Sequence, residues 1–359
     1  MSQFDEIVRN IALETEKCNY NPEIDLNWCN LPMEMRYECV KLMDFKTRTR
    51  LSATSKPEKS LVEAKKIQFQ RLHIDVDDNQ YEWKVTAVTK IRNCEYQTVV
   101  ETMLNPDYRF ISAILKNGEV KNLRLYAAIL YDCYLRPLLD QWSKFAPFRF
   151  ERISVFGIAA IAFFVENCPN LKKVDFHNRY GVPFPFEEML NIPWVTNINE
   201  FRLSHVYPVE INIFLYGLVQ KWIDNDVEVG KSVQCIMQLP WPIPREKLVD
   251  TFAEKFADRI IDNTAEEVRI RMDNPTTQIL LRHIGPRKVQ IDTSMGPSEI
   301  THECFSCKVI PIDMPKSEYG KGDGWIQSIY EKGLKRNGKL EKAMEFDAED
   351  QDIWGHLWS

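Results

Sequence analysis

The chain has 359 residues, of which 44% are hydrophobic and 27% charged, and its formal net charge is −6 at pH 7. At about 150 residues per domain, this length predicts two domains or three. The composition is ordinary for a globular protein and excludes global disorder, and the acidic balance argues against a nucleic-acid partner. The longest apolar run, residues 158–165, is too short to span a bilayer, so we expect no membrane partner.

The first residues, Met1–Ile7, lack the basic and then apolar profile of a signal peptide. The chain has nine cysteines, an odd number, and they are scattered. It has no Asn-x-Ser/Thr acceptor apart from Asn274–Thr276, which contains a proline. We therefore expect a reduced, intracellular compartment, the cytoplasm or the nucleus.

An apolar helical segment follows a polar lead-in. Residues 1–24 are polar, with one possible helix at Gln3–Lys17, and residues 25–67 contain three short helices. In the first helix, apolar residues recur at helical spacing; they are Met35, Cys39, Leu42 and Met43. The other two helices are expected at Phe45–Leu51 and Pro57–Lys65. Helices this short cannot bury all their apolar faces against one another, so they either cap the next domain or present a face to a partner chain.

The periodicity then changes from helical to alternating. Ile67–Val76 alternates apolar and polar residues as a half-buried strand does, and Tyr81–Val88 is its expected hairpin partner. A further strand is expected at Glu119–Tyr126, and an aromatic-rich helix at Ala128–Phe145 with Pro137 inside it. Residues 68–147 are therefore predicted to be a strand-rich linking region.

Residues 148–315 contain strand-like and helical segments in turn. The strand-like segments centre near Ile153, Val174, Arg202, Cys235, Arg269 and Ile291. The helical segments are Ile158–Asn167, Phe186–Leu190, Ile211–Ile223 and Arg245–Phe256. Connections of this length suit helical crossovers between parallel strands. We predict a mixed α/β fold with a leucine-rich-repeat-like α/β domain and a largely parallel sheet; an ordinary open α/β sheet is the alternative.

The composition changes again at residue 316. Ser317–Gly324 is predicted to be a loop, Trp325–Leu340 a basic helix, and Glu345–Asp352 a solvated acidic run. Residues 316–359 are thus expected to form a charged tail.

Two apparent ligand motifs fail on inspection. Gly230–Ser232 resembles the end of a phosphate-binding loop, but Asn225 stands where that loop needs glycine. The alternating carboxylates of Asp224–Glu228 resemble a calcium loop, but Val229 and Cys235 occupy its glycine and twelfth-ligand positions. A Schellman-type helix end followed by a polar turn explains that segment better.

A zinc site has partial support. Cys304 and Cys307 have the spacing of a zinc knuckle, and His283 and His302 lie upstream, but no second pair with that spacing exists. Buried thiols are the preferred interpretation, and a redox pair is the other. We predict no metal and no cofactor.

The sequence also lacks the motifs of nucleophilic catalysis. There is no Gly-x-Ser-x-Gly elbow and no His-Glu-x-x-His helix, and the six histidines are dispersed. His73 and His177 fall in strand patterns, where a structural role is expected. We therefore predict that the protein is not an enzyme.

The segment Trp28–Phe45, which contains Leu31-Pro32-Met33-Glu34, resembles an F-box, a module that typically begins Leu-Pro-x-Glu. Its continuation through Val62 is similar to the version found in expanded nematode F-box families. Leu218–Ser232 and Glu267–Pro275 are similar to the F-box C group of those families.

This resemblance implies a substrate receptor of an SCF-type (Skp–cullin–F-box) ubiquitin ligase, which would dock on a Skp-family adaptor and its cullin scaffold and hold an unknown target protein. A scaffold that acts outside a ligase is the alternative, and an enzyme using Cys304, Cys307 or His302 is a remote one. The adaptor-binding residues it implies are Leu31, Pro32, Met35, Cys39, Leu42, Met43, Leu51 and Leu61.

Strand alternation suggests a target-binding surface. Phe201 and Leu203 are expected to face the core, which would leave Arg202, Ser204 and His205 nearer solvent. By the same alternation Arg269 and Arg271 share a face, and with Arg202 they could form a basic strip for an acidic or phosphorylated target. The alternative is a solvated sheet face with local ion pairs.

Overall fold

The computed structural model describes residues 28–76, 82–91, 94–103, 108–126, 132–177, 185–192, 197–206, 208–238, 246–293 and 296–326. The chain divides into two units, Met1–Leu123 and Arg124–Ser359. The helix expected at Gln3–Lys17, the acidic run and most of the basic helix expected after Trp325 lie outside the described residues.

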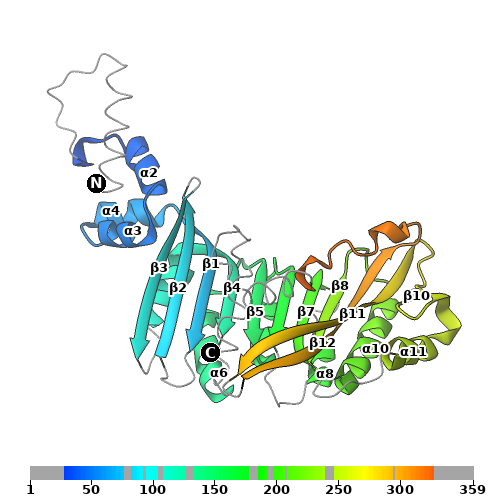
Figure 1. Ribbon diagram of the computed structural model, residues 1–359. Coiled ribbons are helices and arrows are strands. Elements are labelled where there is room, and N and C mark those ends of the chain that lie inside the picture. Colours follow the sequence, from blue (N-terminus) through cyan, green and yellow to red (C-terminus); the bar gives the residue numbers. More distant parts are fainter. Residues whose placement is uncertain are drawn as a thin grey trace. The chain divides into compact units, whose positions relative to one another are not determined.

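The first unit begins with the three helices that the sequence predicts, α2 (Met33–Lys41), α3 (Phe45–Ser52) and α4 (Lys56–Glu63) (Figure 1). A short 3-10 helix that was not predicted, η1 (Trp28–Asn30), precedes them. Asp44 caps α3 by accepting a 2.6 Å hydrogen bond from the Thr47 amide, and Ser55 caps α4. Pro57 lies in the first turn of α4, where its missing amide donor is not needed. Local capping thus fixes where two of these short helices start.

A sheet follows in the same unit. Its strands are β1 (Ile67–Val76), β2 (Glu82–Ile91), β3 (Cys94–Met103) and β4 (Gly118–Tyr126), which begins in this unit and ends three residues beyond Leu123; their order is β3-β2-β1-β4, with α5 (Tyr108–Asn117) before β4. β1 and β2 pair antiparallel, which confirms the predicted hairpin; β3 and α5 were not predicted.

The helices pack on this sheet through aromatic side chains. Phe45 of α3 meets Phe69 of β1 edge to face, with 5.4 Å between ring centroids, and both are buried. Gly118 lies against the same Phe69 ring and leaves no room for a side chain. The start of β4 therefore depends on a residue without a Cβ.

The second unit contains four parallel strands: β5 (Arg152–Phe156), β6 (Lys173–His177), β7 (Glu200–Val206) and β8 (Ser232–Gln238). Its helices are α6 (Asp132–Trp142), α7 (Ile158–Asn167), α8 (Phe186–Asn191), α10 (Pro208–Asp224) and α11 (Glu246–Lys255), with η2 (Ser143–Phe145) after α6. The parallel pairing predicted for the segments at Ile153, Val174, Arg202 and Cys235 is confirmed.

The remaining strands of this unit are antiparallel. They are β9 (Ile260–Asn263), β10 (Glu267–Arg271), β11 (Thr277–Thr293) and β12 (Gly296–Pro311), and the sheet continues β8-β12-β11-β10-β9. The expectation of parallel strands at Arg269 and Ile291 was therefore wrong. Only residues 272–276 link β10 to β11, too few for a crossover, and the Asn274 side chain closes the turn on the Thr276 amide at 3.0 Å. The sheet is mixed, and a leucine-rich-repeat-like architecture is not confirmed.

The two faces of this sheet differ in chemistry. Alternate residues such as Phe201 and Val174 are buried on the helix-covered face, where the ring centroids of Phe201 and of Phe214 in α10 are 6.3 Å apart. The intervening residues form the polar face; its buried members include Asp175, His177, Ser204, Gln234 and Ser306. Ser204 is 1% exposed, so its expected position near solvent was wrong, and the His205 side chain lies outside the described part.

Among the described residues, no helix is both long enough and apolar enough to cross a membrane.

Candidate functional site

The interior of the N-terminal helices contains several residues that the sequence assigned to the adaptor surface. Cys39, Met43 and Leu61 are buried in one cluster with Val40 and Val62. Burial raises the pKa of the Cys39 thiol, and the negative charge of the neighbouring Glu38 raises it further. These side chains cannot meet a partner unless the helices separate, so in the free chain they support the surface rather than form it.

Apolar side chains nevertheless reach the outside at the start of α2. Pro32 is exposed, and Met33 is 48% exposed. The half-buried members of the expected adaptor set are Leu31, Met35, Leu42 and Leu51. The sequence analysis did not include Met33 in the adaptor surface. Its exposure could have been predicted, because Met33 is apolar but lies outside the helical stripe that starts at Met35.

A buried carboxylate holds this surface in place. One oxygen of Glu58 in α4 accepts a 3.0 Å hydrogen bond from Trp28 Nε1 and pairs with Arg36 Nη1 at 3.4 Å, and the other bonds the Ser55 hydroxyl. Arg36 Nε also donates to the Leu31 carbonyl at 3.1 Å. Hydrogen bonds from Ser55 and then Trp28 lower the pKa of Glu58. The turn before Met33 is therefore tied to α4 through charge-assisted bonds.

Arg48 closes the other end of the helices. Its buried guanidinium donates to the backbone carbonyls of Met43 at 3.2 Å, Lys65 at 3.1 Å and Lys41 at 3.4 Å. Burial lowers its pKa to about 10, so it stays charged at neutral pH. Arg48 satisfies orphan carbonyls at the ends of α2 and α4.

In the second unit, residues Met314–Ile326, here called the C-terminal strap, lie on the polar face of the sheet. Trp325 and Ile326 pack on Ile236 and Cys304, and Tyr319 packs on Leu280 and Ile310. The sequence placed residues 316–326 in a charged tail, as a loop followed by the start of a basic helix; the signal for packing was Tyr319 and Trp325 within or beside a glycine-rich loop.

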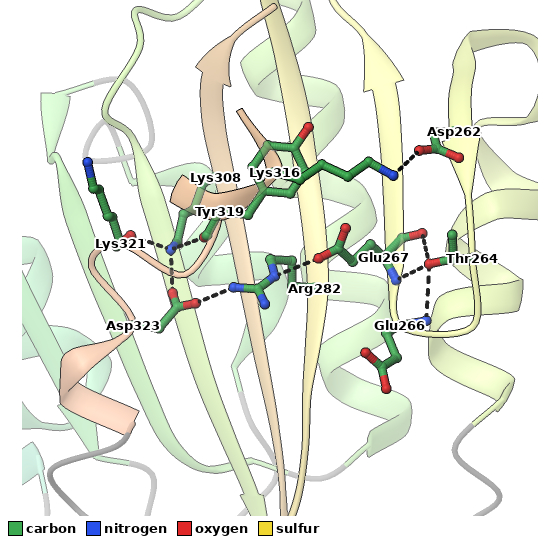
Figure 2. Close-up of polar contacts among 10 residues, drawn as sticks. All are labelled: Asp262, Thr264, Glu266, Glu267, Arg282, Lys308, Lys316, Tyr319, Lys321 and Asp323. Carbon is green, nitrogen blue, oxygen red and sulfur yellow. Dashed lines mark hydrogen bonds and ion pairs between the residues drawn. The ribbon is translucent and has the colours of Figure 1, made fainter. Parts of the chain in front are cut away.

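Asp323 is the polar anchor of the C-terminal strap. It is 2% exposed, lies 2.9 Å from Arg282 Nη1 and also pairs with Lys308 (Figure 2). Lys308 Nζ further donates to the carbonyls of Tyr319 at 3.2 Å and Lys321 at 2.7 Å. Two sheet cations thus neutralise one strap carboxylate and satisfy strap carbonyls.

The three arginines expected to form a basic strip are in different settings. Arg202 is 2.6 Å from Glu200 and lies over the Trp325 ring of the strap at 5.2 Å. Arg269 pairs with Asp262 at 2.9 Å, and Arg271 is exposed. Two of the three are thus neutralised by carboxylates, which matches the alternative of local ion pairs.

His177 links three parallel strands through hydrogen bonds to two serines. His177 Nε2 lies 3.0 Å from Ser154 Oγ, and His177 Nδ1 lies 2.7 Å from Ser204 Oγ. Beside it, Arg152 pairs with Asp175 at 2.7 Å. Both ring nitrogens of His177 are satisfied, as in the structural role expected for it.

The described residues contain no group of three or more histidine, cysteine or carboxylate side chains that could hold a metal ion. Cys304 and Cys307 lie in one strand, and residues three apart in a strand point to opposite faces. Burial raises the pKa of Cys307 and of its neighbour Cys235, as expected for inert buried thiols. The His302 side chain lies outside the described part.

The helix end expected after α10 is a Schellman motif. Asp226 has a left-handed φ of 44°. Its backbone amide donates to the Ile223 carbonyl at 3.1 Å, and the Val227 amide donates to the Trp222 carbonyl at 3.2 Å. This geometry accounts for the segment that resembled a calcium loop.

Comparison with protein families identifies an F-box domain at residues 28–70. No curated protein matches the chain, and no solved structure matches it. The match spans the helices α2–α4 and the start of β1, the part of the chain that carries the exposed Pro32 and Met33.

Proposed function

We propose that this chain is a substrate receptor of an SCF-type ubiquitin ligase. Its F-box docks on a Skp-family adaptor, the adaptor joins it to a cullin scaffold, and the second unit holds a target protein. The receptor changes no covalent bond itself and needs no cofactor, and it acts in the cytoplasm or the nucleus.

The F-box at residues 28–70 is the observation that carries this proposal, because F-box domains typically bind Skp-family adaptors. The geometry supports it. Pro32 and Met33 present apolar surface at the start of α2, and the Glu58 network holds the preceding turn in one conformation. An apolar patch on a preorganised turn is well suited to docking, because little conformational entropy is lost on binding.

The test is co-elution of the full-length chain with a recombinant Skp-family adaptor, comparing the wild type with Met33→Glu. A carboxylate placed in an apolar contact loses its water without gaining a partner. We expect Met33→Glu to weaken binding by at least about tenfold, which corresponds to about 1.4 kcal/mol.

Val229→Glu is the matched control, because Val229 is also 48% exposed but lies in the second unit. It should bind the adaptor like the wild type. Undiminished binding by Met33→Glu, or no adaptor binding by the wild type, would contradict the proposal. If the chain binds the adaptor but excludes cullin from the complex, it is a scaffold outside the ligase.

A further inference from the structure

The polar face of the strands in the second unit has the chemistry of a peptide-binding surface. Across β7, β8, β12 and β11, one row of residues in register runs Arg202, Gln234, Ser306 and Arg282, with Lys308 on the same face two residues along β12. Arg202 pairs with Glu200 at 2.6 Å and Arg282 with Glu267 at 3.0 Å on the sheet itself, and the C-terminal strap adds a further partner to each and supplies the carboxylate that pairs with the buried Lys308.

The strap makes three kinds of contact that could serve recognition. Arg282 and Lys308 hold the Asp323 carboxylate (Figure 2), Arg202 lies over the Trp325 ring, and Gln234 Nε2 donates to the Gly322 carbonyl at 2.7 Å. Arg282 and Lys308 thus select a carboxylate, and Arg202 selects an aromatic ring two residues after it. The Gln234 side-chain amide binds the backbone carbonyl of the residue before the carboxylate. Each contact can be made equally by a segment of another protein.

The strap leaves part of this face unsatisfied. Gln234 Oε1 and Ser306 Oγ have no hydrogen-bond partner among the described residues, although the two side chains are 1% and 0% exposed. Buried polar atoms in native proteins are nearly always paired. An occupant that offers one more donor and acceptor here would fit the face better than the strap does.

We propose that the polar face of β7, β8, β12 and β11 binds a short peptide segment, folded as a turn that runs into a helical turn, with a carboxylate two residues before an aromatic residue, and that the C-terminal strap is its intramolecular occupant. The identification of that segment as part of a ubiquitylation target rests on the proposed function; the binding itself does not. A target then competes with the strap, whose tether gives it an effective concentration of the order of millimolar.

The experiment cuts the tether without removing the strap. A specific protease site is inserted between Asp313 and Met314 of the full-length chain, next to exposed residues, and the folded protein is cleaved there. Fluorescent Met314–Ile326 peptide is then added and its anisotropy followed. We expect saturable exchange into the cleaved protein and at least about tenfold weaker binding to the uncleaved protein.

Two peptide variants test the recognition contacts. Asp323→Asn in the peptide should weaken binding at least about tenfold, because it removes the charge that faces Arg282 and Lys308. Glu318→Gln is the matched control, since Glu318 pairs with Lys321 of the strap itself, and it should bind like the parent peptide.

Three outcomes would overturn the proposal: no exchange of the peptide, equal binding of the Asp323→Asn peptide, or unfolding of the second unit when the tether is cut. Each would make the strap a permanent part of the core. Adaptor co-elution of the cleaved protein is measured in parallel, so failure of the proposed function is seen separately.

Discussion

The Glu58 carboxylate connects the start of the F-box to its last helix. It accepts from Trp28 and Ser55 and pairs with Arg36, whose Nε supports the Leu31 carbonyl. Nothing in the alternation of apolar residues predicts this network, because it joins positions 30 and 22 residues apart through side chains. It is the residue-scale reason that Pro32 and Met33 lie in a defined place.

The lowered pKa of Glu58 predicts a dependence of stability on pH. Its folded-state pKa lies below its unfolded value of about 4.3. The stabilisation is therefore fully present above the unfolded pKa and is lost as pH falls toward the folded pKa. Glu58→Gln should melt below the wild type at pH 7, and the gap between their thermal midpoints should shrink between pH 5 and pH 3.

Circular dichroism melts of the two full-length proteins measure that gap. The other carboxylates titrate in both proteins, so the difference between them isolates Glu58. A gap that stays constant over this pH range would mean that the charge of Glu58 does not stabilise the fold.

At the scale of elements, Gly118 fixes how β4 starts against β1. A Cβ at this position would lie 2.4 Å from Phe69 Cε2 and 2.8 Å from the Ile114 carbonyl oxygen. The Phe69 ring is buried and meets Phe45 of α3, so it has little room to move.

Gly118→Ala should therefore lower the free energy of unfolding by about 1–3 kcal/mol, the usual cost of overpacking. Gly324→Ala is the matched control, because a Cβ added at Gly324 would meet nothing within 4 Å, and it should change stability by less than about 0.5 kcal/mol. Chemical denaturation measures both. Equal effects of the two substitutions would show that the contact with Phe69 does not constrain β4.

Sequence periodicity predicted the elements that local rules determine. Apolar spacing predicted α2, alternation predicted the β1–β2 hairpin, and the length of the connections predicted the four parallel strands. Strand direction in β10–β12 was not predictable from spacing alone, because a tight turn at Asn274 replaces a crossover. The strap was missed because its order comes from distant partners, Arg282 and Lys308, rather than from its own composition.

The candidate site was predictable to a similar extent. The Leu-Pro-x-Glu start located the F-box, which the family comparison matches at residues 28–70. Burial in the free chain separates Cys39, Met43 and Leu61 from the exposed Pro32 and Met33, and a helical stripe alone cannot tell these groups apart.

At the scale of the whole molecule, the chain divides its chemistry between its two units. The first contains the F-box and its exposed apolar turn, and the second contains a mixed sheet whose polar face is covered by the C-terminal strap. The receptor role that we propose requires one unit for a constant partner and another for a variable one, and this division allows it.

The central claim is that the F-box docks on the adaptor, and hydrogen exchange of the full-length chain with and without a Skp-family adaptor tests it most directly. Amides buried in an interface exchange more slowly. We predict slowed exchange within residues 28–63 and unchanged exchange within residues 200–326. Slowed exchange in the second unit alone, or in neither unit, would contradict the account.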